Sequence, residues 1–269
     1  MTSRYEDFAS THHKRDFAMR AMILAAGRGE RMRPLTDLTP KPLLEVGGKP
    51  LIVWHIENLV RASIREIVIN HAHLGMQIEE VLGDGSRFGA HIQYSPEAHA
   101  LETAGGIAFA LRLLGDQPFA AINSDVWCNY DFAHLPERAA VLQASGDAAH
   151  LVLVNNPPHH PNGDFYLNGD RIAPTPPNLP LSGEAHAPPL IRGARGVEVL
   201  TFSGIGLYQP SLFAHIVRGT KAPLAPLLRA QIALGKVSGE HHQGLWADVG
   251  TPQRLAELDR QVGSLHNAP

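Results

Sequence analysis

Short apolar runs alternate with amphipathic segments through the first half of this sequence, and this alternation constrains the fold more than any other feature. The runs stop abruptly at glycine or polar residues, as buried parallel strands do. They predict strands at 20–26, 66–70, 91–94 and 119–123, with helices at 51–62, 74–82 and 104–114 between them. Such alternation indicates an α/β fold whose parallel sheet is covered on both faces. Ligands of these sheets bind where the strands end.

The second half of the chain is less regular. Its pattern predicts strands at 150–154 and 197–208, a hairpin at 165–172 around Asn168-Gly169, a hairpin region at 236–248, and helices from 210, over 223–234 and over 251–262. The Pro-rich stretch 173–196 is incompatible with a helix or a central strand, so we expect a long surface loop. Residues 1–19 are expected to form a flexible leader. We therefore predict one doubly wound, Rossmann-like domain over 20–264 with a mixed, mainly parallel sheet.

Composition narrows the classes of function. The 269 residues include a single cysteine, Cys128, so no internal disulfide can form, and no charged-then-apolar leader opens the sequence, which favours the cytoplasm. The longest apolar runs fall far short of the ~20 residues of a membrane-spanning helix. A net charge of −3 disfavours nucleic acid as a partner. A small anionic ligand bound by a few local charges stays open, and the sequence does not distinguish a monomer from a homodimer.

The segment after the first predicted strand, LAAGRGERM, carries the strongest chemical signal. Gly27 and Gly29 allow backbone amides to approach a ligand closely, and Arg28 and Arg31 stand where they could contact phosphate oxygens. The segment matches neither the P-loop nor the dinucleotide-binding fingerprint, which disfavours a kinase or a dehydrogenase. A tight turn between strand and helix with solvated arginines is the alternative interpretation.

Three charged side chains beyond this loop are further candidates. Lys41 stands between two prolines, so a stiff backbone could direct its ammonium group at phosphate, or leave it in solvent. Asp125 follows a predicted strand and could hold Mg²⁺ or cap a turn. Asp248 precedes the last predicted helix and has the same two alternatives.

The motifs together resemble the signature of the sugar-1-phosphate nucleotidylyltransferases. The resemblance is carried by LAAGRGERMRPLT and TPKPLLEVGGKPL, by the segments 95–106 and 123–125, and by WADVGT at 246–251. That family joins a nucleoside triphosphate to a sugar 1-phosphate and releases pyrophosphate. The resemblance implies that 20–130 bind the nucleotide and 131–264 the sugar, with Mg²⁺ as cofactor.

The same resemblance implies roles for individual residues. Arg31 and Lys41 would be the catalytic residues, and Asp125 and Asp248 the metal ligands. The implied nucleotide contacts are Ala25, Ala26, Gly27, Arg28, Gly29, Arg31, Lys41, Glu97, Glu102, Thr103 and Asn123. Glu102 stands where the family usually has glycine, so this chain departs from the family's pattern in the segment that recognises the nucleobase.

The segments 69–75, 83–89, 164–165 and 201–205 resemble the subfamily that uses UTP and N-acetylmuramate 1-phosphate in peptidoglycan recycling. Relatives have a Glu-Lys-Pro segment where this chain has NNPPHH at 155–160, and Lys221 is a candidate replacement cation or an exposed lysine. The implied sugar contacts are Asn155, Gly163, Asp164 and Ser203. Guanylyl transfer to mannose 1-phosphate, thymidylyl or uridylyl transfer to glucose 1-phosphate, and a nucleotide-sugar sensor without turnover are the alternatives. The paired histidines favour solvated side chains over a zinc site.

Overall fold

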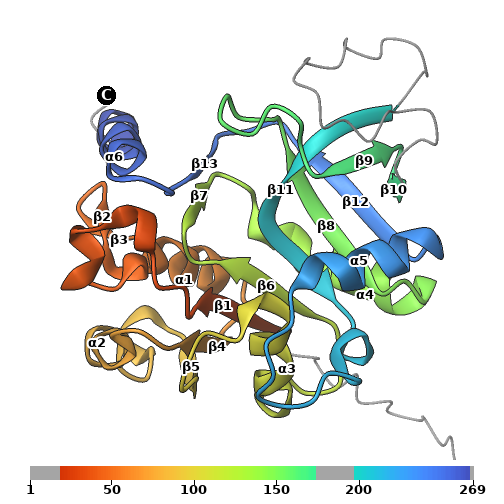
Figure 1. Cartoon of the computed structure of the whole chain (residues 1–269), viewed down its shortest axis with the longest axis horizontal. Coiled ribbons are helices and arrows are strands. Elements are labelled where there is room, and N and C mark those ends of the chain that lie inside the picture. Colours follow the sequence, from red (N-terminus) through yellow and green to blue (C-terminus); the bar gives the residue numbers. More distant parts are fainter. Residues whose placement is uncertain (1–18, 174–196, 267–269) are drawn as a thin grey trace, which may run out of the picture.

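A nine-stranded sheet forms the centre of the molecule. The computed structural model describes residues 19–173 and 197–266, so nearly all of the predicted leader (1–19) and of the predicted Pro-rich loop (173–196) lies outside the described residues (Figure 1). The strand order is β5-β4-β1-β6-β11-β8-β12-β10-β9. The strands of this sheet are β1 (Arg20–Ala25), β4 (Glu66–His71), β5 (His91–Pro96), β6 (Phe119–Asn123), β8 (Ala149–Val154), β9 (Phe165–Asn168), β10 (Arg171–Ala173), β11 (Val197–Tyr208) and β12 (Val237–His242).

The two halves of the sheet differ in direction. The strands β5, β4, β1 and β6 are all parallel, as the alternating first half of the sequence predicts. In the second half β11 runs antiparallel to β6, β8 and β9, and β12 is parallel only to β8. Because β11 also pairs with β9, this half of the sheet closes on itself. The sheet is therefore mixed, and the prediction of a mainly parallel sheet holds for the first half alone.

Helices cover both faces of the sheet. Neighbouring residues of β1 point to opposite faces, so Ile23 packs in one core and Met22 in the other. The core that contains Ile23 includes buried residues of α1 (Leu51–Arg61), α2 (Gly75–Leu82) and α4 (Leu135–Ser145). The core that contains Met22 includes α3 (Glu102–Leu114) and α5 (Leu224–Ala233). This arrangement confirms the predicted α/β class.

Four short strands and the last helix pack beside the first half of the sheet. The last helix, α6 (Pro252–His266), packs against the small hairpin of β2 (Glu45–Val46) and β3 (Lys49–Pro50). Leu258 and Val262 of α6 share a third core with Trp127. Trp127 lies in β7 (Val126–Cys128), which pairs antiparallel with β13 (Trp246–Asp248). The C-terminal segment thus lies against the N-terminal half, as Figure 1 shows.

Three expected elements differ from the structure. The hairpin expected at 236–248 is wrong, because β12 pairs with β8 and β10 while β13 pairs with β7. The helix expected from 210 is a single 3-10 turn over Pro210–Phe213. The sequence analysis assigned no element to α4, where only Leu135 and Leu142 are buried, so its helical repeat is faint. None of the helices in the described part of the chain is both long and apolar enough to span a membrane.

Candidate active site

The glycine-rich loop after β1 bends at Gly29, which has a φ of +66°. Only glycine takes this left-handed conformation at little cost. The bend is fixed by hydrogen bonds to the Gly29 carbonyl from Met32 N at 2.8 Å and from Thr36 Oγ1 at 2.9 Å. Met32 is fully buried, whereas Arg28 and Arg31 are exposed and line a cavity. The sequence therefore anchors the loop by its apolar residue and turns both guanidinium groups toward the cavity.

Lys41 and Asp125 meet at the wall of this cavity, which has a volume of about 500 Å³. Lys41 begins a 3-10 turn after Pro40 and is only 8% exposed. Its Nζ donates to Asp125 Oδ2 over 2.6 Å. Asp125 follows β6, where the hydroxyl of Ser124 donates to the carbonyl of Leu24 at the end of β1. The ion pair balances a nearly buried cation, and both charges face the same space.

Most of the predicted nucleotide contacts line this one cavity. They are Ala26, Gly27, Arg28, Gly29, Arg31, Lys41, Glu102, Thr103 and Asn123, together with Asp125. Asn70, Ser124 and Gly250 also line it, and the sequence analysis did not single them out. Thr103 lies in the first turn of α3, whose start bends at Glu102 with a φ of +62°. A non-glycine residue in this conformation is strained, and such strain is common at ligand sites.

Two predicted nucleotide contacts do not line the cavity. Ala25 is 3% exposed, and its amide donates to Asn70 Oδ1 over 2.9 Å. Glu97 is 6% exposed and accepts hydrogen bonds from Asn70 Nδ2 and from the amide of Leu101. Both residues are turned inward because their polar atoms satisfy buried neighbours. Ala25 and Glu97 therefore lie behind the cavity wall, where they do not contact a nucleotide directly.

Asp248 lies beside Asp125 through the ladder between β7 and β13. In that ladder Asp248 pairs with Val126, and the amide of Val249 donates to the carbonyl of Asp125 over 2.8 Å. Both carboxylate oxygens of Asp248 accept hydrogen bonds from Arg254 at 2.7 Å. His159 Nε2 also lies 2.8 Å from Asp248 Oδ1. The structure brings the two predicted metal ligands to neighbouring positions although they are far apart in the sequence.

The donor set can be compared with the needs of Mg²⁺. Asp125 and Asp248 supply carboxylate oxygens, which this hard ion prefers. Over 19–173 and 197–266, no group of three or more His, Cys, Asp or Glu side chains could hold a metal ion. Mg²⁺ usually takes one or two carboxylates and completes its shell with phosphate oxygens and water. Asp125, which lines the cavity, fits a magnesium ion shared with a phosphate ligand, whereas Asp248 lies at the neighbouring strand position with both oxygens bonded to Arg254.

His55 contacts the backbone next to Asp125. It was not among the candidate residues named from the sequence. It lies in α1, is 2% exposed, and donates from Nε2 to the carbonyl of Val126 over 2.8 Å. Its ring also stacks on Phe132. Burial lowers the pKa of His55 to about 4, so the ring is neutral at pH 7. The signal available in the sequence was one polar residue on the otherwise apolar, buried face of α1.

The predicted sugar contacts lie in and beside the segment 155–164, outside the lining of the main cavity. Asn155 is exposed and contacts His241 at 3.1 Å, and Asp164 accepts from the amide of Phe202 at 2.8 Å. Gly163 lies close to the backbone of β11. Ser203 is only 1% exposed, and its hydroxyl accepts from the amide of Ile205, so direct contact with a sugar is not compatible with its position. Lys221 is exposed and does not line the main cavity.

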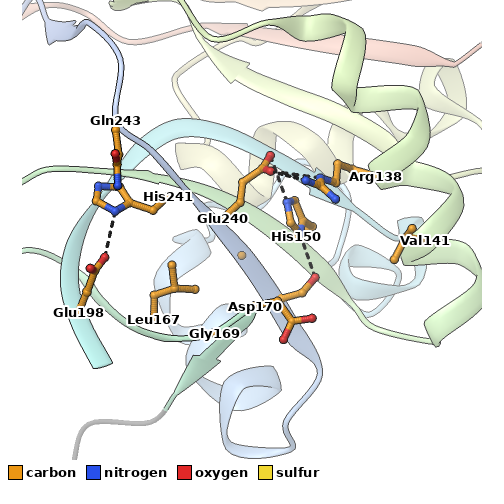
Figure 2. Close-up of a pocket in the computed structure, with 12 residues that line it drawn as sticks. Arg138, Val141, His150, Leu167, Gly169, Asp170, Glu198, Glu240, His241 and Gln243 are labelled. Atoms are coloured by element: carbon orange, nitrogen blue, oxygen red, sulfur yellow. Dashed lines mark hydrogen bonds and ion pairs between the residues drawn. The ribbon is translucent and has the colours of Figure 1, made fainter. Parts of the chain in front are cut away.

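A second cavity, of about 460 Å³, lies against α4, β8, β12 and the β9–β10 hairpin (Figure 2). Glu240 at this cavity accepts hydrogen bonds from Arg138 at 2.8 Å and from Tyr130 at 2.5 Å, and His150 Nε2 lies 3.5 Å away. Burial raises the pKa of Glu240, but the neighbouring His150, Tyr130 and Arg138 outweigh it and lower the value to about 2. The charge of Glu240 is thus matched by its own neighbours.

Sequence comparison places the chain in a family. Residues 20–169 match the family model described as nucleotidyl transferase. The chain belongs to this family. The matched segment contains the glycine-rich loop, Lys41 and Asp125.

Relatives along nearly the whole chain carry more specific names. The chain is 53% identical over 247 residues to the N-acetylmuramate alpha-1-phosphate uridylyltransferase of Neisseria meningitidis serogroup B, which covers 91% of this chain and 99% of that protein. It is 30% identical over 246 residues to the mannose-1-phosphate guanyltransferase of Hypocrea jecorina, over 87% of this chain and 62% of that protein.

A solved structure shows the same fold. A Bacillus anthracis protein of the glucose-1-phosphate thymidylyltransferase type superposes with a TM-score of 0.72 at 20% identity, over 94% of this chain and 98% of that one. This likeness supports the Rossmann-like α/β architecture of the nucleotidyl transferase family.

Proposed function

We propose that this protein transfers UMP from UTP to N-acetylmuramate α-1-phosphate and releases pyrophosphate, a reaction of peptidoglycan recycling. The 53% identity to a uridylyltransferase of this specificity along 91% of the chain carries the proposal. The cavity supports it, because Arg31, Lys41 and Asp125 share one space and Asp248 is adjacent. The retention of all four charged residues also argues against a sensor without turnover.

The reaction needs no nucleophile from the protein. A sugar 1-phosphate is mostly dianionic at pH 7, since the second pKa of a phosphate monoester is near ~6. One of its oxygens forms a bond to the α-phosphorus of UTP, and the bond from that phosphorus to the bridging oxygen of pyrophosphate breaks. The protein must bring several phosphates together and offset their charge.

The residues of the cavity divide this task in the proposed mechanism. The amides of the Gly27–Gly29 loop and the guanidinium group of Arg31 bind the two phosphates that leave as pyrophosphate. The ammonium group of Lys41 holds the sugar phosphate beside the α-phosphate. Asp125 and Asp248 would hold Mg²⁺, which supplies charge neutralisation for phosphate oxygens when bound. Residues 20–130 thus form the nucleotide half.

The sugar half, 131–264, is proposed to contact its substrate through the segment 155–164. His159 of this segment already reaches Asp248, so the segment lies at the edge of the phosphate site. Asn155, Gly163 and Asp164 are the proposed sugar-side residues. Ser203 is left out because its hydroxyl is buried and bonded to the backbone.

Pyrophosphate release tests the proposal directly. The purified chain is assayed with magnesium, UTP and N-acetylmuramate 1-phosphate, and in parallel with N-acetylglucosamine 1-phosphate as the acceptor. GTP with mannose 1-phosphate is the second donor and acceptor pair, because a relative at 30% identity is named for that reaction. Turnover is expected to be fastest with UTP and N-acetylmuramate 1-phosphate. Equal or faster turnover with GTP and mannose 1-phosphate would replace the uridylyl assignment by a guanylyl one.

A further inference from the structure

A continuous series of buried hydrogen bonds runs behind the main cavity, between two segments that contribute to its lining. It begins at the amide of Ala25, which donates to Asn70 Oδ1 over 2.9 Å. Asn70 Nδ2 donates to Glu97 Oε1 over 2.7 Å, and Glu97 Oε2 accepts from the amide of Leu101 over 2.9 Å. The four residues are between 2% and 6% exposed. We call this series the Asn70–Glu97 relay.

The relay has only one arrangement that satisfies all its groups. The Ala25 and Leu101 amides can only donate, so the Asn70 oxygen must face Ala25 and its NH₂ group must face Glu97. The carboxylate of Glu97 accepts both remaining hydrogen bonds, one on each oxygen. Gly106 packs against the same groups and leaves no room for a side chain, because a Cβ at this position would lie 2.8 Å from Asn70 Nδ2 and from Glu97 Oε1.

The relay ends where the two ligand-binding segments begin. Ala25 is followed by Ala26 and Gly27 of the glycine-rich loop, and Leu101 is followed by Glu102 and Thr103 at the start of α3. A second clamp holds α3 from outside, since Ala222 exchanges backbone hydrogen bonds of 3.0 Å with Leu101 and Gly105. The relay therefore sets the distance between the loop and the start of α3, and both segments line one cavity.

We propose that Asn70 and Glu97 are positioning residues that fix the spacing between the glycine-rich loop and the start of α3, which line the same cavity, and thereby select a nucleoside triphosphate of one size. This inference rests on the proposed function, in which both segments bind one nucleotide. A rigid spacing lowers the cost of ordering the site when the nucleotide binds. Neither side chain takes part in bond making; both act through the backbone they hold.

Exchange of the two polar groups tests the relay. In Asn70→Asp two buried carboxylates face each other, and in Glu97→Gln one donor faces another donor, whichever way the amides turn. The double variant Asn70→Asp/Glu97→Gln restores every hydrogen bond, because the new carboxylate accepts from Ala25 and from the new amide, whose oxygen accepts from Leu101. We expect each single variant to raise the KM for UTP about tenfold, and the double variant to return it to within about threefold of wild type.

A merely structural role would not give the remaining results. The KM for the sugar 1-phosphate should stay within about twofold of wild type in the single variants, while the preference for UTP over GTP in kcat/KM falls about tenfold. Glu79→Gln is the matched control, since Glu79 accepts a 2.7 Å hydrogen bond from His71 away from the cavity lining. That control should keep the wild-type KM for UTP.

Several outcomes would overturn the proposal that Asn70 and Glu97 are positioning residues. One is a wild-type KM for UTP in folded single variants, and another is a double variant as impaired as the single ones. If the single variants do not fold, Gly106→Ala takes their place, because its methyl group presses on both side chains; an unchanged KM for UTP there also overturns the proposal. Absence of pyrophosphate release by the wild-type protein with every donor would instead refute the proposed function.

Discussion

Replacement of His55 by glutamine should remove a specific pH dependence of stability. His55 is fully buried, and burial lowers its pKa from 6.5 to about 4, although its hydrogen bond to Val126 opposes the shift. Below pH 6.5 the unfolded chain takes up a proton at this position and the folded chain does not until about pH 4. Stability is therefore complete above pH 6.5 and falls as the pH drops toward 4.

The size of the effect follows from the two pKa values. Between pH 7 and pH 5 this residue should cost the wild-type protein about 2 kcal/mol of unfolding free energy, and about 3 kcal/mol by pH 4. Glutamine does not titrate, and its amide can still donate to the carbonyl of Val126. His55→Gln should therefore lose less stability than wild type over the same range.

Denaturant unfolding of both proteins at pH 7 and pH 5 measures the difference. The free energy of unfolding of wild type minus that of His55→Gln should be about 2 kcal/mol smaller at pH 5 than at pH 7. If the gap is the same at both values, His55 is not buried in the neutral form and the assignment is refuted. Other titrating groups are common to both proteins, so they cancel in the comparison.

Three further changes test the site and its surroundings. Lys41→Ala should lower kcat/KM about 100-fold or more with little loss of stability, because it removes a phosphate-binding charge while Asp125 is partly exposed; kinetics with a thermal melt check this, and activity near wild type would contradict it. Burial raises the pKa of Cys128 to about 11, so its thiol should resist iodoacetamide at pH 8 until the chain is unfolded; mass spectrometry reads the outcome, and alkylation of the native protein would show that the thiol is accessible. Glu240→Gln should be less stable than wild type at pH 7 and should lose less stability between pH 4.5 and 2, where the low pKa of Glu240 makes acid destabilising; equal acid sensitivity in denaturant unfolding would rule this out.

The parts of the site that are contiguous in sequence were predictable. The glycine-rich loop and Asp125 each directly follow a buried strand, and apolar runs of this kind can be recognised without tertiary information. Parallel strands then bring their ends to one edge of the sheet. The cavity that unites Arg31, Lys41 and Asp125 is the expected result.

The contacts made across the fold were not predictable. The pairing of β13 with β7 joins segments that are distant in sequence, and the short strand pattern of 246–248 fits a local hairpin equally well. The inward orientation of Glu97 and Ser203 depends on which buried donors lie next to them. The weak helix α4 has too few buried residues to produce a clear repeat. In each case the deciding partner comes from another part of the chain.

The ladder between β7 and β13 has a consequence for how the protein is made. Asp125 leaves the ribosome well before Asp248, which lies 123 residues further along the chain. The strands β5, β4, β1 and β6 all precede β13 in the sequence, so they are synthesised before it. A nascent chain would thus contain the Gly27–Gly29 loop well before it contains Asp248. If Asp248 holds Mg²⁺ as proposed, nucleotidyl transfer cannot begin before this late segment has been synthesised and has paired with β7.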